Sequence, residues 1–161
     1  MSKWSKLKNR IEDLFVPNLG MNIECNVFIY NIFWRITIDP TIWITLDKKI
    51  IFDFIKDSKG LPVIPIPEYG VAYQGKGKNC RVYLRSFPKI IDIIYEYIKT
   101  PKNVLFDRVF EHDYFGLTDV LKAADRRIGK KKLLLLKEKT QSKAVKKIID
   151  KRLGVTEPIE N

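Results

Sequence analysis

His112 is the only histidine of the 161 residues, so any Ser-His-Asp, Cys-His or zinc site would have to use it. It stands between Glu111 and Asp113, and a histidine beside a carboxylate can act as a general base. Adjacent residues on a helix point away from one another, however, and the helix dipole favours a histidine at a helix end. We therefore interpret His112 as a solvent-facing residue at a helix end, and we predict neither a catalytic residue nor a metal site.

Two other segments have residue types that could do chemistry. Asp47, Asp53 and Glu68 could together hold a metal ion of the kind that nucleases use, but their spacing matches no defined site, and acids are common at turns and strand ends. Gly75–Lys78 lacks the remaining glycines and the Ser or Thr of a phosphate-binding loop, which indicates a solvated hairpin tip. The sequence therefore predicts no enzyme and no cofactor.

Positive charge is concentrated near the C-terminus. The formal net charge is +11; residues 1–121 hold 17 Lys and Arg against 14 Asp and Glu, whereas residues 122–152 hold 13 against three. Solvated helix faces usually interleave acids that pair with lysines one turn away, so this imbalance costs stability and indicates a use for the charge. The candidate binding residues are Arg126, Arg127, Lys130, Lys131, Lys132, Lys143, Lys146, Lys147 and Lys151.

Two classes of partner suit these cations. We favour an acidic protein, captured by a non-catalytic binding module through a basic helical face. The alternative is nucleic acid, held by phosphate contacts from the same residues. Gln141 is the only Asn, Gln or aromatic residue of the segment, so such binding would tolerate any base sequence.

The apolar periodicity predicts an α+β fold: an N-terminal helix, a mostly antiparallel sheet of four to six strands, and a C-terminal group of four or five helices. The first helix should be capped by Ser2 and end before Gly20; it could rest on a membrane, but packing over the sheet is the preferred interpretation. Alternation predicts strands over about residues 20–85, with a break at Asp39–Pro40 and a hairpin turn at Asp47–Lys49.

The helical part spans about residues 86–154. Thr100 should cap a helix that buries Val109 and is closed by Gly116. Thr118 should cap the next helix, and Gly129 should end it. One or two further helices are expected over 130–139 and 142–153. In the last one the apolar stripe predicts outward lysines opposite a buried side formed by Ala144, Val145, Ile148, Ile149 and Leu153.

Length and composition predict a single domain over residues 1–161, with a short tail at 155–161. No apolar run approaches the roughly 20 residues of a membrane span, and no apolar stretch of the kind found in signal peptides follows the basic start. Cys25 and Cys80 are expected to be buried free thiols. These features predict a cytoplasmic protein without a transmembrane segment.

Three blocks, Met1–Leu7, Trp43–Lys48 and Gly116–Lys130, resemble those of a family of small uncharacterised bacterial proteins that carry them in this order. The resemblance extends from the first residue to about Leu153. It implies a bacterial cytosolic accessory protein, similar in size to the immunity factors that neutralise toxins. It brings no assigned activity, so no functional residue is carried over.

Overall fold

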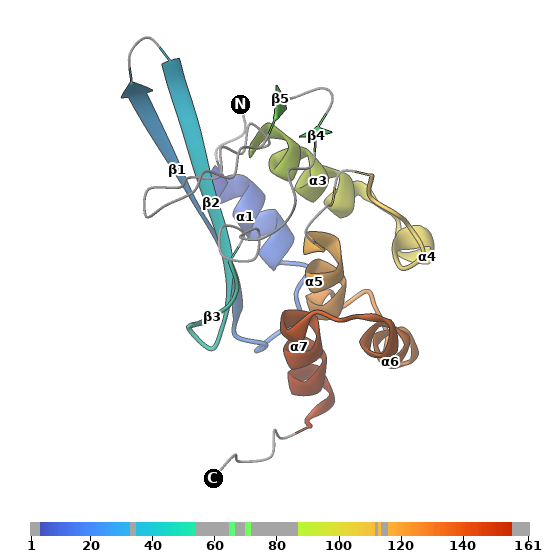
Figure 1. The fold of residues 1–161 in the computed structure, drawn as a ribbon. Coiled ribbons are helices and arrows are strands. Elements are labelled where there is room, and N and C mark those ends of the chain that lie inside the picture. Colours follow the sequence, from blue (N-terminus) through green and yellow to red (C-terminus); the bar gives the residue numbers. More distant parts are fainter. Residues whose placement is uncertain are drawn as a thin grey trace.

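A computed structural model describes residues 4–32, 35–53, 65–66, 70–71, 87–111, 113 and 116–155 (Figure 1). The chain begins with helix α1 (Trp4–Glu12), followed by strands β1 (Met21–Ile32), β2 (Arg35–Leu46) and β3 (Lys49–Asp53). Two short strands, β4 (Pro65–Ile66) and β5 (Gly70–Val71), pair with each other. The helices α3 (Phe87–Lys99), α4 (Lys102–Leu105), α5 (Leu117–Ala124), α6 (Lys130–Lys139) and α7 (Lys143–Leu153) complete the fold.

The main sheet of the described residues is antiparallel and has the order β1-β2-β3. The α+β class is confirmed, but this sheet has three strands rather than the expected four to six. The predicted break at Asp39–Pro40 is wrong: β2 runs through both residues, and Pro40 pairs with Val27 of β1. Strand β2 pairs with β3 only from Trp43 onwards. Pro40 lies before that point, so its lack of an N–H group removes no hydrogen bond between β2 and β3.

The predicted hairpin at Asp47–Lys49 is confirmed. β2 ends at Leu46, β3 starts at Lys49, and the two turn residues have positive φ angles of 49° at Asp47 and 65° at Lys48. Left-handed conformation at both central residues is the type I′ geometry, whose twist matches that of the flanking strands. This turn places Lys48 and Lys49 at the end of the sheet.

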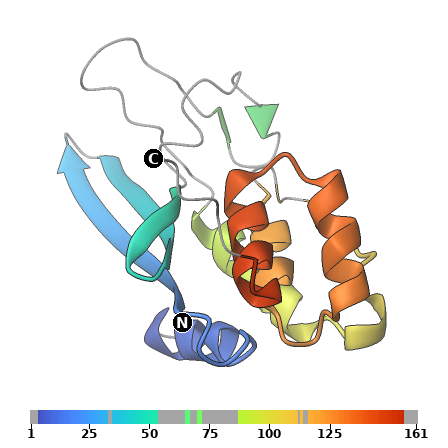
Figure 2. The same cartoon turned by 90° about the horizontal axis from the view of Figure 1, so that it is seen from below.

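The helices gather on one side of the sheet, as Figures 1 and 2 show. Helix α1 packs against β1 and α3, while α3 contacts β2 and α7 contacts β3. Leu7 and Ile11 of α1 are buried, so the preferred packing of this helix over the sheet is confirmed. One hydrophobic cluster joins α1, the sheet and the C-terminal helices. No helix within the described ranges is both long and apolar enough to cross a membrane.

Several helix boundaries differ from those predicted. Helix α4 is only four residues long, and Val109, expected to be buried, is 83% exposed. Thr100 does not cap α4; its hydroxyl donates to the Glu96 carbonyl at 2.7 Å and so belongs to the end of α3. Helix α5 ends at Ala124 rather than at Gly129.

The predicted cap of α5 is also wrong. Asp113 performs this role in place of Thr118: its carboxylate accepts hydrogen bonds from the N–H groups of Leu117 and Thr118 at 2.8 and 2.7 Å. The Thr118 hydroxyl also donates to Asp113, so the threonine is held by the cap. A carboxylate before the first turn satisfies free N–H groups and favours the helix dipole.

Candidate functional site

Helix α7 has the boundaries and the burial that its apolar spacing predicts. The Ser142 hydroxyl accepts a hydrogen bond from the Val145 N–H at 3.3 Å, which caps the first turn. Gly154, with φ of 70°, ends the helix, and the Val155 N–H reaches the Asp150 carbonyl at 2.9 Å in a Schellman arrangement. Ala144, Val145, Ile148 and Ile149 form the buried side as predicted, whereas Leu153, which was expected there too, is half-buried.

The four candidate lysines of α7 are not equally exposed. Lys143 and Lys147 are exposed, Lys146 is half-buried, and Lys151 is half-buried against the β2–β3 turn. The Lys151 ammonium lies 2.5 Å from the Asp47 carboxylate, which ties α7 to the sheet. The outward face predicted for α7 is therefore present, with Lys143 and Lys147 as its freest cations.

Helix α6 lies beside α7, and two of its leucines form the side that packs on the core. Leu133 is 1% exposed and Leu136 is 6% exposed, so residues on the opposite side of the helix face outward. Among the candidates, Lys130 and Lys131 are exposed. Lys132 is half-buried, and its ammonium lies 5.4 Å from the centre of the Phe106 ring, which joins α6 to the end of α4.

Arg127 lies in a buried network rather than on the open surface. Its guanidinium is 2.7 Å from the Asp125 carboxylate, whose side chain has no exposed area, and it also donates to the Thr100 carbonyl at 2.9 Å. The hydroxyl of fully buried Tyr97 donates to the same carboxylate at 2.8 Å. Arg126, one residue away, is exposed, and its backbone N–H donates to the Leu14 carbonyl. The structure thus separates two adjacent candidates: Arg126 faces outward, and Arg127 joins elements of the fold.

Other cations of residues 122–152 also serve the fold. The Arg152 guanidinium donates to the carbonyls of Ala123, Asp125 and Ile128 at 2.8 to 3.1 Å, so it satisfies acceptors where α5 ends and the chain turns towards α6. Lys137 pairs with Asp150 and links α6 to α7. These contacts remove Lys137 and Arg152 from the charge that is free to meet a partner.

Lys122 is a buried cation on α5. Its ammonium donates to the carbonyls of Phe106 and Arg108 at 3.1 and 3.2 Å, and it lies 3.9 Å from Asp119. Burial lowers the pKa of the Lys122 ammonium from its usual value. Through these two carbonyls, Lys122 fastens the segment between α4 and α5 to helix α5.

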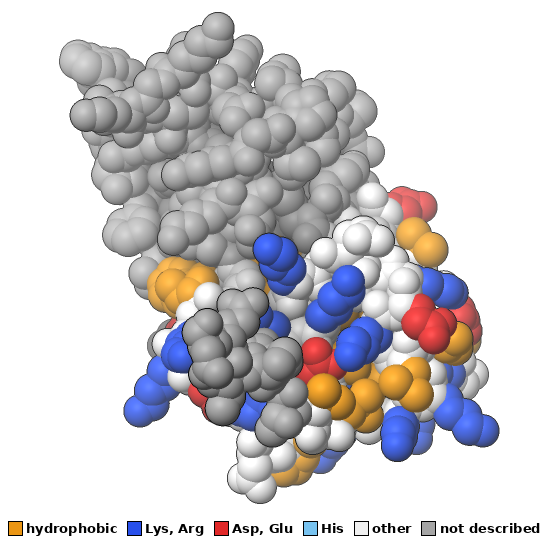
Figure 3. Space-filling view, turned by 60° about the horizontal axis from the view of Figure 1, so that its bottom comes forward, with side chains coloured by type: hydrophobic (Ala, Val, Ile, Leu, Met, Phe, Trp, Pro, Cys, Tyr) orange, Lys and Arg blue, Asp and Glu red, His pale blue; other side chains and the backbone are white. Residues whose placement is uncertain are grey.

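Seven cations of residues 122–152 make no side-chain hydrogen bond, ion pair or contact with an aromatic ring within the part of the chain that the structure describes. Two of the three acids of residues 122–152 form ion pairs: Asp125 binds Arg127, and Asp150 binds Lys137. The third acid is Glu138. We call these seven residues the cationic face: Arg126, Lys130, Lys131, Lys139, Lys143, Lys146 and Lys147. Figure 3 shows Lys and Arg side chains spread over this side of the molecule.

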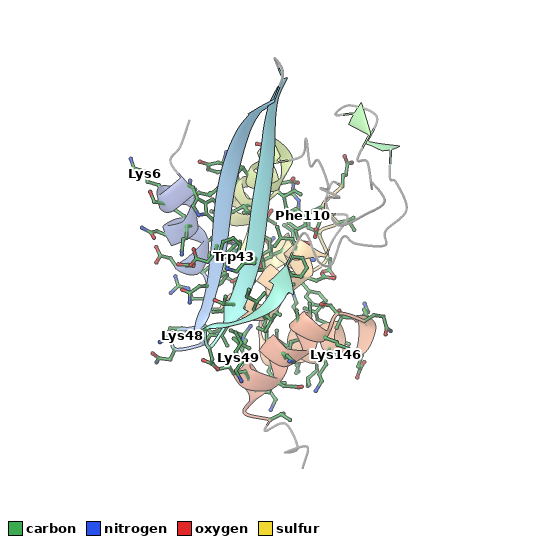
Figure 4. The ribbon with its side chains drawn as sticks, turned by 60° about the vertical axis from the view of Figure 1, so that its left-hand side comes forward. Lys6, Trp43, Lys48, Lys49, Phe110 and Lys146 are labelled. Atoms are coloured by element: carbon green, nitrogen blue, oxygen red, sulfur yellow. The ribbon has the colours of Figure 1, made fainter. Side chains whose placement is uncertain are left out.

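The fold brings two further lysines to this region that the sequence analysis missed. Lys48 and Lys49 are exposed at the β2–β3 turn, and the Asp47–Lys151 pair holds that turn against α7 (Figure 4). They are about one hundred residues from α7 in sequence. The hairpin signal predicted the turn, but no local pattern could place it next to the last helix.

The other residues considered for chemistry do not form a site in the described part of the chain. His112, Glu68, Cys80 and Gly75–Lys78 lie outside the described residues, while Asp47 is paired with Lys151. Within the ranges described, no three His, Cys, Asp or Glu residues lie close enough to share a metal ion.

Replacing Tyr97 by phenylalanine tests the buried network through its pH dependence. Burial, and then the neighbouring Asp125 carboxylate, raises the pKa of the Tyr97 hydroxyl well above its usual value. In the unfolded chain this hydroxyl ionises near pH 10, so its contribution to stability is full below that pH and falls as the pH rises further. At pH 7, Tyr97→Phe should cost about 1.5–3 kcal/mol, the range for a hydrogen bond to a charged acceptor.

Above pH 10 the difference between wild type and Tyr97→Phe should shrink, by up to about 1.4 kcal/mol per pH unit. Urea unfolding of both proteins at neutral pH and at about pH 11 measures it, since other titrating groups cancel in the difference. A difference that stays constant with pH would contradict the position assigned to Tyr97.

The family comparison gives a partial match. A family model described as the SF0329 protein family matches residues 3–67, which covers α1, the three-stranded sheet and β4. This is an uncharacterised family, and the matched residues exclude the Gly116–Lys130 block and the cationic face. No curated protein and no solved structure matches the chain.

Proposed function

We propose that this protein is a non-catalytic binding module that captures an acidic protein through the cationic face. The observation that carries this proposal is the cationic face itself, of which six cations are exposed and Lys146 is half-buried. Among the described residues, Glu138 is the one acid of residues 122–152 that has no ion pair. Such a surface repels itself and attracts negative charge, and its field favours the approach of an acidic partner.

The placement of the lysines supports this proposal. The first turns of α6 and α7 contain no acid, and they begin with Lys130, Lys131 and Lys132 and with Lys143. The positive end of the helix dipole disfavours cations at these positions, typically by 0.3–1 kcal/mol each. In α7, Lys147 also lies four residues from both Lys143 and Lys151, a spacing at which like charges repel. A surface that lowers the stability of its own helices is explained most simply by a partner that uses it.

A protein partner is favoured over nucleic acid by the groups that accompany the charge. Bases bind through stacking on exposed aromatic rings or through Asn, Gln and Arg side chains. Helix α6 instead exposes two leucines, and the Phe106 ring lies under Lys132. Nucleic acid held by phosphate contacts alone is the second candidate, and the lysines of the cationic face support it. An accessory module of the immunity type, which occupies a partner's surface rather than transforming a substrate, fits the first candidate.

Charge reversal at the cationic face should weaken capture without weakening the fold. Lys131→Glu with Lys147→Glu changes one exposed residue on each helix. We expect partner affinity to fall roughly 10- to 100-fold, because each change opposes an acidic surface. Stability should hold or rise slightly, since a glutamate is preferred at both places. The matched control, Lys6→Glu with Lys102→Glu, alters the net charge equally at exposed residues outside the cationic face (Figure 4 shows Lys6 on α1).

The partner is identified by photo-crosslinking in the native cells, from a benzoylphenylalanine placed at Lys143 or, as a control, at Lys6. One acidic protein crosslinked from position 143 alone, whose measured affinity falls in the charge-reversed variant, supports the proposal. Equal crosslinking from both positions contradicts it. Binding to random-sequence DNA that collapses between roughly 50 and 200 mM salt, with no protein crosslink, would establish the second candidate instead. The triple change at Lys130, Lys131 and Lys132 is less informative, because Lys132 also contacts Phe106.

A further inference from the structure

Helix α6 contains four consecutive leucines, of which the core uses two. Leu133 and Leu136 are buried, whereas Leu134 and Leu135 are 42% and 46% exposed. A single exposed leucine needs no explanation, since much of any protein surface is apolar. Two adjacent ones at the centre of an outward face, on a helix where lysine or glutamine would form the helix equally well, are unusual.

The two exposed leucines are bordered by charge along the helix. Lys130 is four residues before Leu134, and Lys131 is four residues before Leu135, so each lysine lies one turn away on the same side. At the other end, Glu138 is four residues after Leu134 and Lys139 four after Leu135. We call the outward surface of these six residues the leucine–lysine strip. Figure 3 shows such a mixture, with hydrophobic side chains next to Lys and Arg side chains on this side of the molecule.

The dimensions of the strip fit one helix of a partner. Ten helical residues extend about 15 Å, which is the length of roughly three turns of a second helix packed alongside. Leucines at the centre of such a contact would be dehydrated by the partner's apolar residues, and the lysines would meet acids that flank those residues. An amphipathic helix with an acidic rim therefore complements the strip in both shape and charge.

Other occupants fit less well. A second copy of this chain would bring together two strips that each carry three lysines and one glutamate, in a protein whose net charge is already +11. An anionic membrane surface fits less well, because two half-exposed leucines offer little apolar area for insertion. Phosphates would pair with the lysines but leave the leucines unused.

We propose that the leucine–lysine strip docks an acidic amphipathic helix of the partner, with Leu134 and Leu135 as the apolar anchors and Lys130, Lys131 and Lys139 as the charged rim. This inference rests on the proposed function and specifies how the partner is recognised. The wider cationic face attracts the partner. The leucines provide specificity, because they bind an acidic helix with an apolar stripe more tightly than an acidic surface without one.

The test uses two synthetic peptides of about four helical turns with identical composition and charge. In the first, leucines recur at positions i, i+3, i+4 and i+7 with glutamates beside them; in the second, the same residues are shuffled so that no stripe forms. Fluorescence anisotropy measures the affinity of the full chain for each labelled peptide. We expect the striped peptide to bind roughly 10- to 30-fold more tightly, from the apolar area of two leucines.

Two variants separate this inference from the function on which it rests. Leu134→Gln with Leu135→Gln should bind both peptides with the affinity that the wild type has for the shuffled one, because charge remains and the anchors are gone. If this variant still prefers the striped peptide, the inference is overturned and the proposed function stands. If Lys131→Glu with Lys147→Glu leaves the affinity for both peptides unchanged, the proposed function itself fails.

Four other outcomes would also overturn the inference. The wild type could bind neither peptide, or bind both equally. It could bind vesicles of phosphatidylcholine and phosphatidylglycerol, with the leucine variant losing that binding, which would indicate a lipid surface. It could form a dimer in sedimentation that the leucine variant does not form, which would indicate a second copy. Thermal unfolding of each variant confirms that the change in binding is not caused by loss of the fold.

Discussion

Replacing Asp125 by alanine should lower the free energy of unfolding by about 3–5 kcal/mol, the range for removal of one partner from a buried ion pair. The Asp125 side chain is fully buried, and its carboxylate accepts from the Tyr97 hydroxyl and from the Arg127 guanidinium and N–H. Without it, Arg127 stays beneath the surface with its charge uncompensated and the Tyr97 hydroxyl loses its acceptor. Urea denaturation at neutral pH measures the effect.

Arg126→Ala is the matched control, because Arg126 is adjacent in sequence and its side chain is exposed. We expect it to change stability by less than about 0.5 kcal/mol. A double-mutant cycle of Asp125→Ala and Arg127→Met isolates the pair itself, and the double variant should lose less than the sum of the two single losses. An Asp125→Ala protein as stable as the control would show that the network does not support the fold.

The same network also fixes where the cationic face begins. Asp125 ends α5, and its backbone carbonyl accepts from Arg152 of α7, while Arg127 reaches back to the Thr100 carbonyl. Phe15 pairs with Asp125 as an isolated bridge, and the Leu14 carbonyl accepts from the Arg126 N–H. The segment that leads into α6 is therefore held from the N-terminal region, α3 and α7 together. The Gly116–Lys130 block, whose charged residues were a reason to expect binding, contains structural ion pairs as well as exposed cations.

The sequence predicts the elements whose signals are local. The hairpin turn at Asp47 and Lys48 and most of the buried stripe of α7 follow from neighbouring residues. Boundaries that depend on distant partners are wrong. Asp113 caps α5 from inside the segment where a helix closed by Gly116 was expected. Helix α5 stops at Asp125, whose side chain is buried in contact with Tyr97 and Arg127.

The same distinction between local signals and distant contacts applies to the candidate site. Periodicity alone indicates that Lys143 and Lys147 face away from the buried stripe, and both are exposed. Periodicity cannot distinguish Arg126 from Arg127, since the difference is made by an acid two residues away and a tyrosine on α3. Nor can it divide the four leucines of α6 into buried and exposed pairs without knowing which side packs on the core.

That division of the leucines gives the second large prediction. Leu133→Ala should cost about 2–5 kcal/mol, because Leu133 is 1% exposed and its removal leaves a cavity between α6 and the core. Leu134→Gln, one residue along the same helix, should change stability by less than about 0.5 kcal/mol, since the side chain is 42% exposed and glutamine is an equally good helix former. Urea denaturation of the two variants beside the wild type gives both numbers.

The comparison tests the orientation of α6, on which the leucine–lysine strip depends. If Leu134→Gln were as costly as Leu133→Ala, the helix would be rotated so that Leu134 packs inward, and Lys130 would turn with it because the two residues share a side. If Leu133→Ala were nearly neutral, α6 would not be anchored to the core at all. With the expected result, the exposed leucines contribute little to folding, and binding of a partner accounts for their presence between lysines.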